Sequence, residues 1–442
     1  MVEAHHLNED IYQNILSRLP AKSLLQYRTV SKQWRAMISD PQFISLHASN
    51  SCSKSSHVFA SVYLKGSRPF LWNASAAGIH SALESFLLQK GADIVGSCNG
   101  LVFCWNYDGL SSSIMILNPT NMDYISLPDP LKEMSLMCQE PFASYSIETS
   151  VGLAFDPCMG STGFNYQVVL VEALVPNWQA SYETPHGLKF QIYNSKTGAW
   201  SMSGETNSSH TLSDASPVYH KGVLFWLSIK AQILAFDVER QQSCLLELPS
   251  QIVEEKRNTS SANCDDEWFG ALGGGLCYLR TGNTTVNVWT ATADYKEAQW
   301  VLKYSLCLQS IVYNHLCLLN SLLNRHTCSS EMVCSKRSLD LKVCEMDMKF
   351  FHPLCLCGDN RVLLRAGDSI LSYDIETETF VECCDFRRPI GSRPIPEPTC
   401  IKSSTRGLFV LSSRWWVGTT VKEEAEGTSA TEVMTAVAAV RS

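Results

Sequence analysis

Apolar residues recur at helical spacing near the start of the chain. Between Leu7 and His47 they lie three or four positions apart, and turn signals divide the stretch into short pieces. The pattern predicts a first helix that begins at Asn8, whose side chain can accept a first-turn amide, and that ends near Pro20. Two more short helices follow, so we expect a three-helix unit at residues 1–46.

A unit of three helices in about 40 residues lies near the lower size limit for independent folding, because it buries too little surface to offset its conformational entropy. We therefore expect it to depend on a further surface. Periodicity alone leaves two interpretations open. Either the helices cap the domain that follows, or another protein covers their apolar side.

The pattern changes after a polar, serine-rich linker at residues 47–57. From residue 58 to residue 417 the apolar residues form short runs bounded by Gly, Asn, Asp and Pro, which is typical of β-strands. Residues 418–442 are rich in alanine and charge and have no strand pattern, so we expect a mobile or weakly helical tail. The expected fold class is α+β multidomain, with a small helical unit followed by an all-β domain.

An internal repeat runs through the β-domain. Four predicted strands end in an apolar residue followed by Asn or Asp, and we call this polar residue the marker: Leu117-Asn118, Tyr193-Asn194, Phe236-Asp237 and Tyr373-Asp374. The residues after each marker supply a turn. Three of the four repeats place an aromatic residue where the next strand begins, since the sixth positions after the markers are Tyr124, Trp200, Ser243 and Phe380.

The spacing of the markers is that of propeller blades. Asn194 and Asp237 lie 43 residues apart, and Asp237 and Asp374 lie 137 apart, close to three periods of about 45. A β-sandwich, the structural alternative, gives no reason for a recurring aromatic residue or for this period. We expect a β-propeller of about six blades, in which the segment from Tyr313 to Cys344 fits no blade cleanly.

Composition and charge exclude several classes of function. The net charge of -8 and the lack of a basic stripe argue against a nucleic-acid partner. The acidic, polar stretch from Met1 to Asn8 is not a secretory signal, so we expect the chain inside the cell, in the cytoplasm, the nucleus or both. No apolar run approaches the roughly 20 residues that span a bilayer, so no membrane partner is expected.

The sequence offers little support for catalysis or metal binding. Its 18 cysteines are scattered through predicted strands, where reduced thiols act as small hydrophobic residues. Zinc sites usually combine two pairs of ligands, and neither Cys355-x-Cys357 nor Cys383-Cys384 has a matching second pair. The one segment where a metal could bind contains His326, Cys328, Cys334 and Cys344. The glycine run Gly273-Gly274-Gly275 lacks the lysine that follows the glycines of a phosphate loop. We interpret it as a blade turn. We predict no catalytic residue, no metal site and no cofactor.

Five segments of the helical unit together resemble the F-box over its full length: Leu7-Asn8-Glu9-Asp10, Ile15-Leu16-Ser17-Arg18-Leu19-Pro20, Lys22-Ser23-Leu24, Val30-Ser31-Lys32-Gln33-Trp34-Arg35 and Ser39-Asp40-Pro41-Gln42-Phe43. Two positions depart from the usual pattern, since Asn8 stands where proline is expected and Ser31 where cysteine is usual. The stretch from Val58 to Trp416 is similar to the plant F-box-associated, kelch-like repeat region, on segments that include Gly96-Ser97-Cys98-Asn99-Gly100-Leu101, Leu117-Asn118-Pro119, Leu127-Pro128 and Leu248-Pro249.

The resemblance implies a substrate-recognition subunit of an SKP-cullin-F-box ubiquitin ligase, which performs no chemistry itself. In such a subunit the F-box binds an SKP-type adaptor, and through it a cullin-RING scaffold, while the propeller binds a target protein. The residues that match the adaptor-facing and core positions of the family are Leu7, Ile11, Ile15, Leu16, Leu19, Pro20, Leu24, Val30 and Trp34. The rival interpretation is a propeller enzyme or a carbohydrate-binding protein whose helical unit is only a cap.

The target-binding residues remain unknown at this stage. Two insertions, from Met159 to Pro185 and from Glu254 to Asp266, are candidate contact loops, because recognition residues concentrate on loops held by a rigid scaffold. Tryptophan contributes strongly to protein interfaces, and the candidate surface aromatic residues are Trp178, Trp415 and Trp416.

Overall fold

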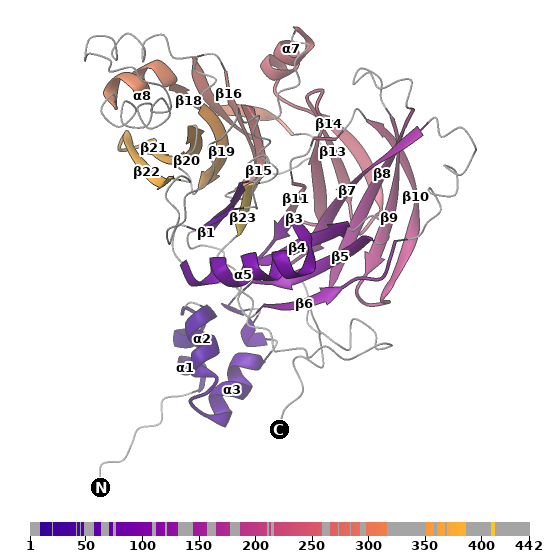
Figure 1. Ribbon diagram of the computed structural model, residues 1–442, viewed down its shortest axis with the longest axis vertical. Coiled ribbons are helices and arrows are strands. Elements are labelled where there is room, and N and C mark those ends of the chain that lie inside the picture. Colours follow the sequence, from indigo (N-terminus) through magenta and orange to yellow (C-terminus); the bar gives the residue numbers. More distant parts are fainter. Residues whose placement is uncertain are drawn as a thin grey trace.

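Figure 1 shows the computed structural model of the protein, in which a helical head is joined to a β-domain. The head lies at one end of the long axis, and α7 (Ser250–Asn258) lies at the other. The residues that the structure describes are 9–19, 21–40, 42–44, 46–47, 57–62, 70–73, 77–107, 112–119, 122–130, 145–156, 165–176, 186–209, 212–213, 216–258, 266–272, 274–282, 284–291, 298–315, 351–357, 360–366, 369–385 and 408–411.

The helical head contains the three predicted helices, which are confirmed as α1 (Glu9–Leu16), α2 (Ala21–Tyr27) and α3 (Lys32–Ser39). A further helical segment covers residues 42–44 and 46–47. The predicted helix cap at Asn8 lies outside the described residues. Apolar side chains from all these elements enclose one core, made of Leu16, Leu24, Met37, Ile38 and Phe43. The head therefore has a core of its own.

The β-domain contains five four-stranded antiparallel sheets, each a meander in chain order, which we number as blades 1 to 5. Blade 1 consists of β3 (Ala92–Cys98), β4 (Leu101–Tyr107), β5 (Ser112–Asn118) and β6 (Asp123–Ser126). Blade 2 consists of β7 (Tyr145–Phe155), β8 (Tyr166–Pro176), β9 (His186–Asn194) and β10 (Ala199–Ser209). Blade 3 consists of β11 (Val218–His220), β12 (Val223–Leu227), β13 (Gln232–Asp237) and β14 (Gln242–Glu247).

Blades 4 and 5 complete this series. Blade 4 consists of β15 (Glu267–Leu272), β16 (Gly275–Thr281), β17 (Thr285–Ala291) and β18 (Trp300–Cys307), and α8 (Leu308–Asn314) follows it. Blade 5 consists of β19 (Phe351–Cys357), β20 (Arg361–Ala366), β21 (Ser369–Asp374) and β22 (Thr379–Asp385). The first strands of neighbouring blades contact one another, so the blades are arranged around these inner strands as in a β-propeller.

The cores of the β-domain lie between neighbouring blades, each of which contributes one apolar face. Between blades 2 and 3, Phe190 stacks on Phe236 with ring centroids 4.6 Å apart. In the same interface the ring of Trp226 approaches Gly152, and a Cβ atom on this glycine would lie 2.8 Å from it. Glycine is required at this point because any side chain would separate the two blades.

A sixth sheet combines the two ends of the β-domain. It has three strands in the order β2 (Phe70–Asn73), β1 (His57–Val62) and β23 (Leu408–Leu411). Strand β23 contacts both β3 and β19, which are the first strands of blades 1 and 5. Next to this sheet, α5 (Ala77–Lys90) packs Leu83, Phe86 and Leu87 onto the outer apolar face of blade 1. The helix thus covers a face that a full neighbouring blade would otherwise cover.

The marker residues end the third strand of their blades, as predicted. Three of the four markers hold the following turn, because their Oδ1 atoms accept hydrogen bonds from backbone N–H groups two or three positions later. Asn194 accepts from Lys196, Asp237 from Glu239 and Arg240, and Asp374 from Glu376 and Thr377. The fourth residue after each marker has a positive φ, at Met122, Gly198, Gln241 and Glu378. One turn type therefore recurs in four blades.

The residue six positions after each marker pairs with the residue that precedes the marker. The pairs are Leu117 with Tyr124, Tyr193 with Trp200, Phe236 with Ser243 and Tyr373 with Phe380. The recurring aromatic residue is thus a cross-strand neighbour of a buried side chain, where large rings add packing area. The indole of Trp200 also donates a hydrogen bond of 2.7 Å to the carbonyl of Pro128 in blade 1, which ties two blades together.

Ser243, the exception to the aromatic rule, has a different neighbour. Strand β10 bulges between Met202 and Thr206, and this irregularity brings Glu205 to the outer strand of blade 3. The Glu205 carboxylate accepts hydrogen bonds from the Ser243 amide at 2.9 Å and from its hydroxyl at 2.5 Å, and Asn207 donates to the same hydroxyl. A polar residue therefore links blades 2 and 3 where an aromatic residue stands in other repeats.

The predicted three periods between Asp237 and Asp374 are wrong for the described residues. Only blade 4 lies between blades 3 and 5 there, and residues 316–350 lie outside the described part of the chain. Blade 4 lacks a marker because its third strand ends at Ala291. Its fourth strand still begins with an aromatic residue, because Trp300 pairs with Ala291. The Trp300 indole donates a hydrogen bond to the carbonyl of Glu247 in blade 3. The described chain therefore has five complete blades, where about six were expected.

Candidate functional site

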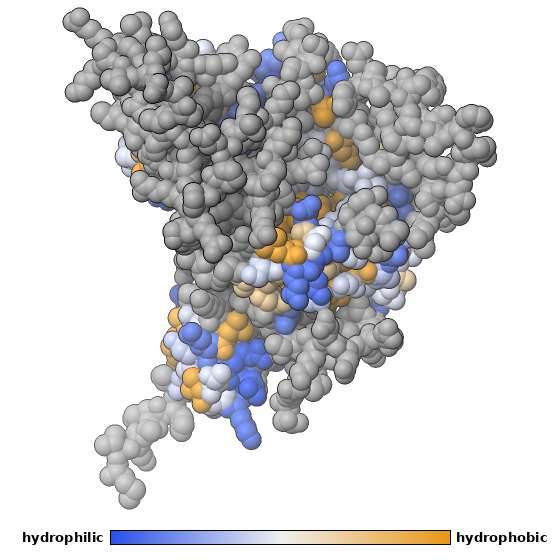
Figure 2. Space-filling view, in the orientation of Figure 1, coloured by the Kyte–Doolittle hydropathy of each residue, from blue (hydrophilic) through white to orange (hydrophobic). Residues whose placement is uncertain are grey.

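The helical head exposes large aliphatic side chains to solvent. Ile11 and Ile15 on α1 are 44% and 51% exposed, and Val30, between α2 and α3, is 62% exposed. Figure 2 shows hydrophobic surface on the head beside strongly hydrophilic surface. Exposed apolar residues gathered on so small a unit mark an interaction site, because their burial against a partner removes apolar surface from water. We call Ile11, Ile15 and Val30 the exposed apolar set.

The structure separates the predicted adaptor-binding residues into three groups. Leu16 and Leu24 are buried in the core of the head, and Leu19 and Trp34 are partly buried against that core. Ile11, Ile15 and Val30 form the exposed apolar set. Leu7 and Pro20 lie outside the described residues. Helical periodicity places Ile11 and Ile15 on one face of α1 and Leu16 on another, but it does not say which of the two faces is covered by the core.

Two tyrosines that the sequence reasoning missed surround Trp34. The Trp34 ring lies 6.1 Å from that of Tyr12 and 5.8 Å from that of Tyr27, measured between centroids. Tyr12 could have been found from its spacing, because it precedes Leu16 by four and Leu19 by seven positions, which is the spacing of one helix face. The three rings therefore form one aromatic cluster, in which Tyr12 and Trp34 are partly buried against the core of the head.

The start of α3 explains why serine is tolerated where the F-box pattern usually has cysteine. Ser31 has an extended backbone, and its side-chain oxygen accepts a hydrogen bond of 3.0 Å from the amide of Trp34. This is the geometry of an N-cap, which satisfies one of the first amides of a helix. Ser31 therefore fixes the backbone at Trp34.

The last part of the head returns to the end of α1. His47 is buried, and its Nε2 lies 2.9 Å from the carbonyl oxygen of Leu19. Burial lowers the pKa of the His47 imidazole, and the hydrogen bond to Leu19 opposes this shift. Sequence reasoning did not single out His47, since a lone histidine at the edge of a polar linker carries no periodic signal.

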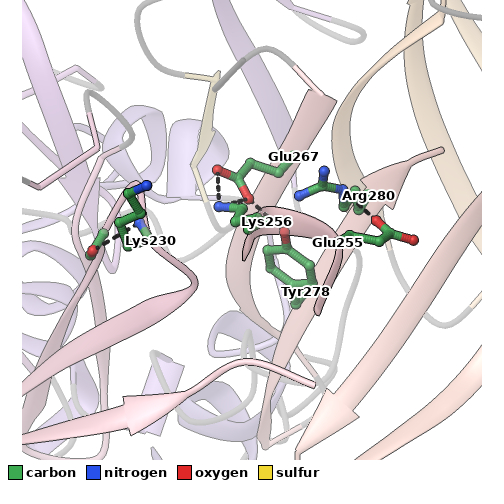
Figure 3. A network of polar contacts seen from close by, with 7 residues as sticks. Lys230, Glu255, Lys256, Glu267, Tyr278 and Arg280 are labelled. Atoms are coloured by element: carbon green, nitrogen blue, oxygen red, sulfur yellow. Dashed lines mark hydrogen bonds and ion pairs between the residues drawn. The ribbon is translucent and has the colours of Figure 1, made fainter. Parts of the chain in front are cut away.

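A polar network joins α7 to blade 4 at the end of the molecule opposite the head (Figure 3). The Lys256 ammonium of α7 lies 2.8 Å from the Glu267 carboxylate, and the Tyr278 hydroxyl donates to that carboxylate at 2.5 Å. Burial, and then the nearby Glu267 charge, raise the pKa of Tyr278 well above its usual value. Each of the three groups has a partner within the network, which therefore anchors α7 to blade 4 and leaves no reactive group poised for catalysis.

The two candidate contact loops are only partly loops. Residues 166–176 of the first form β8, which pairs with β7 on one side and β9 on the other, so this part of the prediction is wrong. Blade 2 has strands of 11 residues, and a long buried strand was mistaken for an insertion. In the second, residues 254–258 belong to α7. Outside the described residues lie Trp178, Trp415 and Trp416.

The glycine run of the β-domain forms a turn between two strands. Gly274, at a positive φ, lies in the hairpin between β15 and β16, which confirms the blade turn. Within the described part of the chain, no three His, Cys, Asp or Glu side chains gather as metal ligands do. Among the same residues, none of the helices combines the length and apolar character that a bilayer crossing requires. The candidate metal ligands His326, Cys328, Cys334 and Cys344 lie outside the described residues.

Comparisons with known proteins follow the same division of the chain. Residues 5–46 match the model of the F-box domain, and residues 42–337 match that of the F-box associated beta propeller domain. The F-box protein At5g07610 of Arabidopsis thaliana is 22% identical over 401 residues, which are 87% of this chain and 87% of that protein. The F-box/kelch-repeat protein At3g23880 of Arabidopsis thaliana is 26% identical over 325 residues, which are 68% of this chain and 79% of that protein.

Among solved structures, a chain of "Crystal Structure of Mitotic Checkpoint Complex" matches with a TM-score of 0.28 and 13% identity, over 65% of this chain and 62% of that chain. The assignment of the propeller rests on the strand pairing and on the family match, and not on this structural likeness.

Proposed function

The chain belongs to the family of F-box proteins with an F-box associated β-propeller, and we propose that it is the substrate-recognition subunit of an SKP-cullin-F-box ubiquitin ligase. The observation that carries this proposal is the exposed apolar set on the helical head. The head has its own core, yet it leaves Ile11, Ile15 and Val30 in solvent. An SKP-type adaptor would cover these side chains.

The energetics favour such an interface. Fully burying an exposed aliphatic side chain of this size is worth about 1.5–3 kcal/mol, and because these three are about half exposed, covering each of them contributes about half of that. Leu16 and Leu24, in the core beneath, hold the helices that display the set. Of the predicted adaptor-binding residues, the exposed ones would contact the adaptor and the buried ones would support them.

The propeller would supply the second half of the function. Through the adaptor, the head would connect the chain to a cullin-RING scaffold, and the propeller would hold a target protein near the ubiquitin-charged enzyme. Tethering raises the effective concentration of the target without any chemistry by the receptor itself. The head and α7 lie at opposite ends of the molecule, which leaves the α7 end open to a target while the adaptor is bound (Figure 1). We place this activity in the cytoplasm, the nucleus or both.

We also propose that the sheet of β2, β1 and β23 acts as a sixth blade. Its strand β23 contacts the first strands of blades 1 and 5, and α5 stands beside it where the fourth strand of a blade would be. Pairing of β1 with β23 would then join the first and last strands of the ring and resist its opening. This interpretation supports the expected total of about six blades.

The adaptor test uses two variants of the full chain. In the first, Ile11→Ser and Ile15→Ser are combined, and affinity for a purified SKP-type adaptor is measured by biolayer interferometry. We expect a loss of at least about tenfold, with unchanged thermal unfolding, because both side chains are exposed in the free chain. Wild-type affinity in this variant would refute the proposal.

The matched control is Val381→Ser. Val381 is 57% exposed on β22, far along the chain from the head. We expect this variant to bind the adaptor as the wild type does. An equal loss in both variants would mean that exposed aliphatic residues act non-specifically, and it would count against the head as the binding surface.

A further inference from the structure

His47 lies in the last helical segment of the head and forms a hydrogen bond with the turn that follows α1. Its side chain is 3% exposed, and Nε2 lies 2.9 Å from the carbonyl oxygen of Leu19, 28 positions earlier in the chain. The ring stacks on Phe43 with centroids 6.5 Å apart, and Phe43 is part of the core of the head. The imidazole is therefore fixed on one side by packing and on its edge by a hydrogen bond.

The chemistry of the two groups assigns the direction of this hydrogen bond. A carbonyl oxygen can only accept, so Nε2 must carry the proton and donate it. The last carbonyls of a helix have no intrahelical partner, and a buried carbonyl without a partner is costly. The backbone after α1 forms a tight turn, in which the Leu19 amide donates a hydrogen bond of 3.0 Å to the carbonyl oxygen of Leu16. The partner of the Leu19 carbonyl is the Nε2–H group of His47.

Asp40 places His47 at the correct distance. Its Oδ1 accepts hydrogen bonds from the amides of Gln42 at 2.7 Å and Phe43 at 3.3 Å, and its carbonyl accepts from Ile44 at 3.0 Å. These bonds cap the start of the helical segment that contains His47. The segment begins directly after α3, so His47 connects the third helix of the head to the end of the first.

From this geometry we propose that His47 is a positioning residue for the adaptor-binding surface. The exposed residues Ile11 and Ile15 lie on α1, and Leu19, which His47 holds, lies in the turn that follows this helix. The hydrogen bond to Leu19 thus sets how α1 and its exposed residues stand relative to the helical segment of His47. The inference rests on the proposed function, and it assigns to His47 an effect through Leu19 and not a contact with the adaptor.

Two substitutions separate the hydrogen bond from the ring. His47→Phe keeps an aromatic ring against Phe43 but removes the donor. His47→Gln removes the ring but keeps an N–H group near the position of Nε2. If the hydrogen bond positions α1, adaptor affinity falls by about tenfold in H47F, the effect of leaving a buried carbonyl unsatisfied, and returns to within about threefold of wild type in H47Q.

The measurements are adaptor affinity of the full chain by biolayer interferometry and amide hydrogen exchange at residues 16–19. Both are made well below the thermal midpoint of each variant, so that loss of affinity cannot come from unfolded chain. Faster exchange and weaker binding in H47F, both restored in H47Q, support the proposal. Wild-type affinity in H47F, or losses in H47Q equal to those in H47F, would overturn it.

The same data distinguish failure of this inference from failure of the proposed function. If the wild-type chain does not bind the adaptor, the proposed function fails and the adaptor role of His47 fails with it. If the wild type binds and H47F binds equally well with unchanged exchange at residues 16–19, only the role of His47 is refuted.

Discussion

The helical head and the propeller differ in how completely they bury their apolar residues. The head encloses one small core and leaves Ile11, Ile15 and Val30 in solvent. The propeller distributes its apolar residues among cores between successive blades. In the five blades, the described aliphatic residues that are strongly exposed lie on fourth strands, at Val301, Leu302 and Val381.

This difference follows from size. A short three-helix unit has too few residues to cover both sides of each helix, whereas each inner blade of the propeller has a neighbour on either side. We therefore expect the head to depend on a partner for part of its stability, and the propeller to depend on the packing of neighbouring blades. Substitutions in the two regions should consequently have separable effects.

The largest effect is expected at the interface of blades 2 and 3. Replacing Trp226, which packs against Gly152, by alanine should lower the free energy of unfolding of the propeller by about 3–5 kcal/mol, because the indole is buried and leaves a cavity. Urea unfolding followed by tryptophan fluorescence measures the loss. Adaptor binding by the head should persist in the folded variant, and its loss would show that the two regions are not independent.

A smaller effect on total stability is expected from Leu24→Ala in the head. Leu24 is fully buried, so its truncation should cost the head about 2–4 kcal/mol, enough to unfold much of so small a unit. Circular dichroism of the helices and adaptor affinity should both decline, while hydrogen exchange in blades 2 and 3 stays at wild-type levels. Rescue of the helices by excess adaptor would show that the partner completes the fold of the head.

The smallest effect is the pH dependence of the head. Because the pKa of His47 is lowered in the folded state, the unfolded chain takes up a proton first, near the ordinary histidine value of about 6.5. The stability of the head is therefore complete above that value, and it is lost as the pH falls through it toward the lowered pKa. Urea unfolding of the head at several values between pH 8 and pH 5 measures the slope.

The control for this pH dependence is His47→Gln, which keeps a donor but cannot titrate. The free energy of unfolding of the head should depend on pH in the same way in wild type and in this variant above about pH 6.5, and the two slopes should differ below it. Equal slopes in the two proteins would assign the pH dependence to other groups, and the propeller should contribute no part of the difference.

Several features of the fold could be predicted from the sequence because they depend on neighbouring residues. Asn194, Asp237 and Asp374 identify the ends of strands, since each accepts hydrogen bonds from amides two or three positions away. The three helices of the head were likewise found from their local periodicity. The markers did not identify blade 4, because Ala291 stands where a marker would be and its connection to Trp300 is longer, although the glycine run indicated one of its turns.

The candidate site was only half predictable. The sequence identified the correct helices, and its periodicity places Ile11 and Ile15 on a different face of α1 from Leu16, but it could not say which of these faces is buried. Nor could it find the contact of His47 with Leu19, because nothing local links two residues on different helical segments. Both facts depend on how the helices cross.

The sequence by itself determined the three helices of the head, the turns that follow the markers, and that an F-box precedes a repeating β-domain. Only the tertiary structure decided which side chains of the head remain in solvent, why Ser243 replaces an aromatic residue, and how β1 finds β23 at the far end of the chain. The physical reason is the range of the interactions. Caps, turns and periodicity act over a few residues, whereas burial depends on surfaces that meet only after the chain has folded.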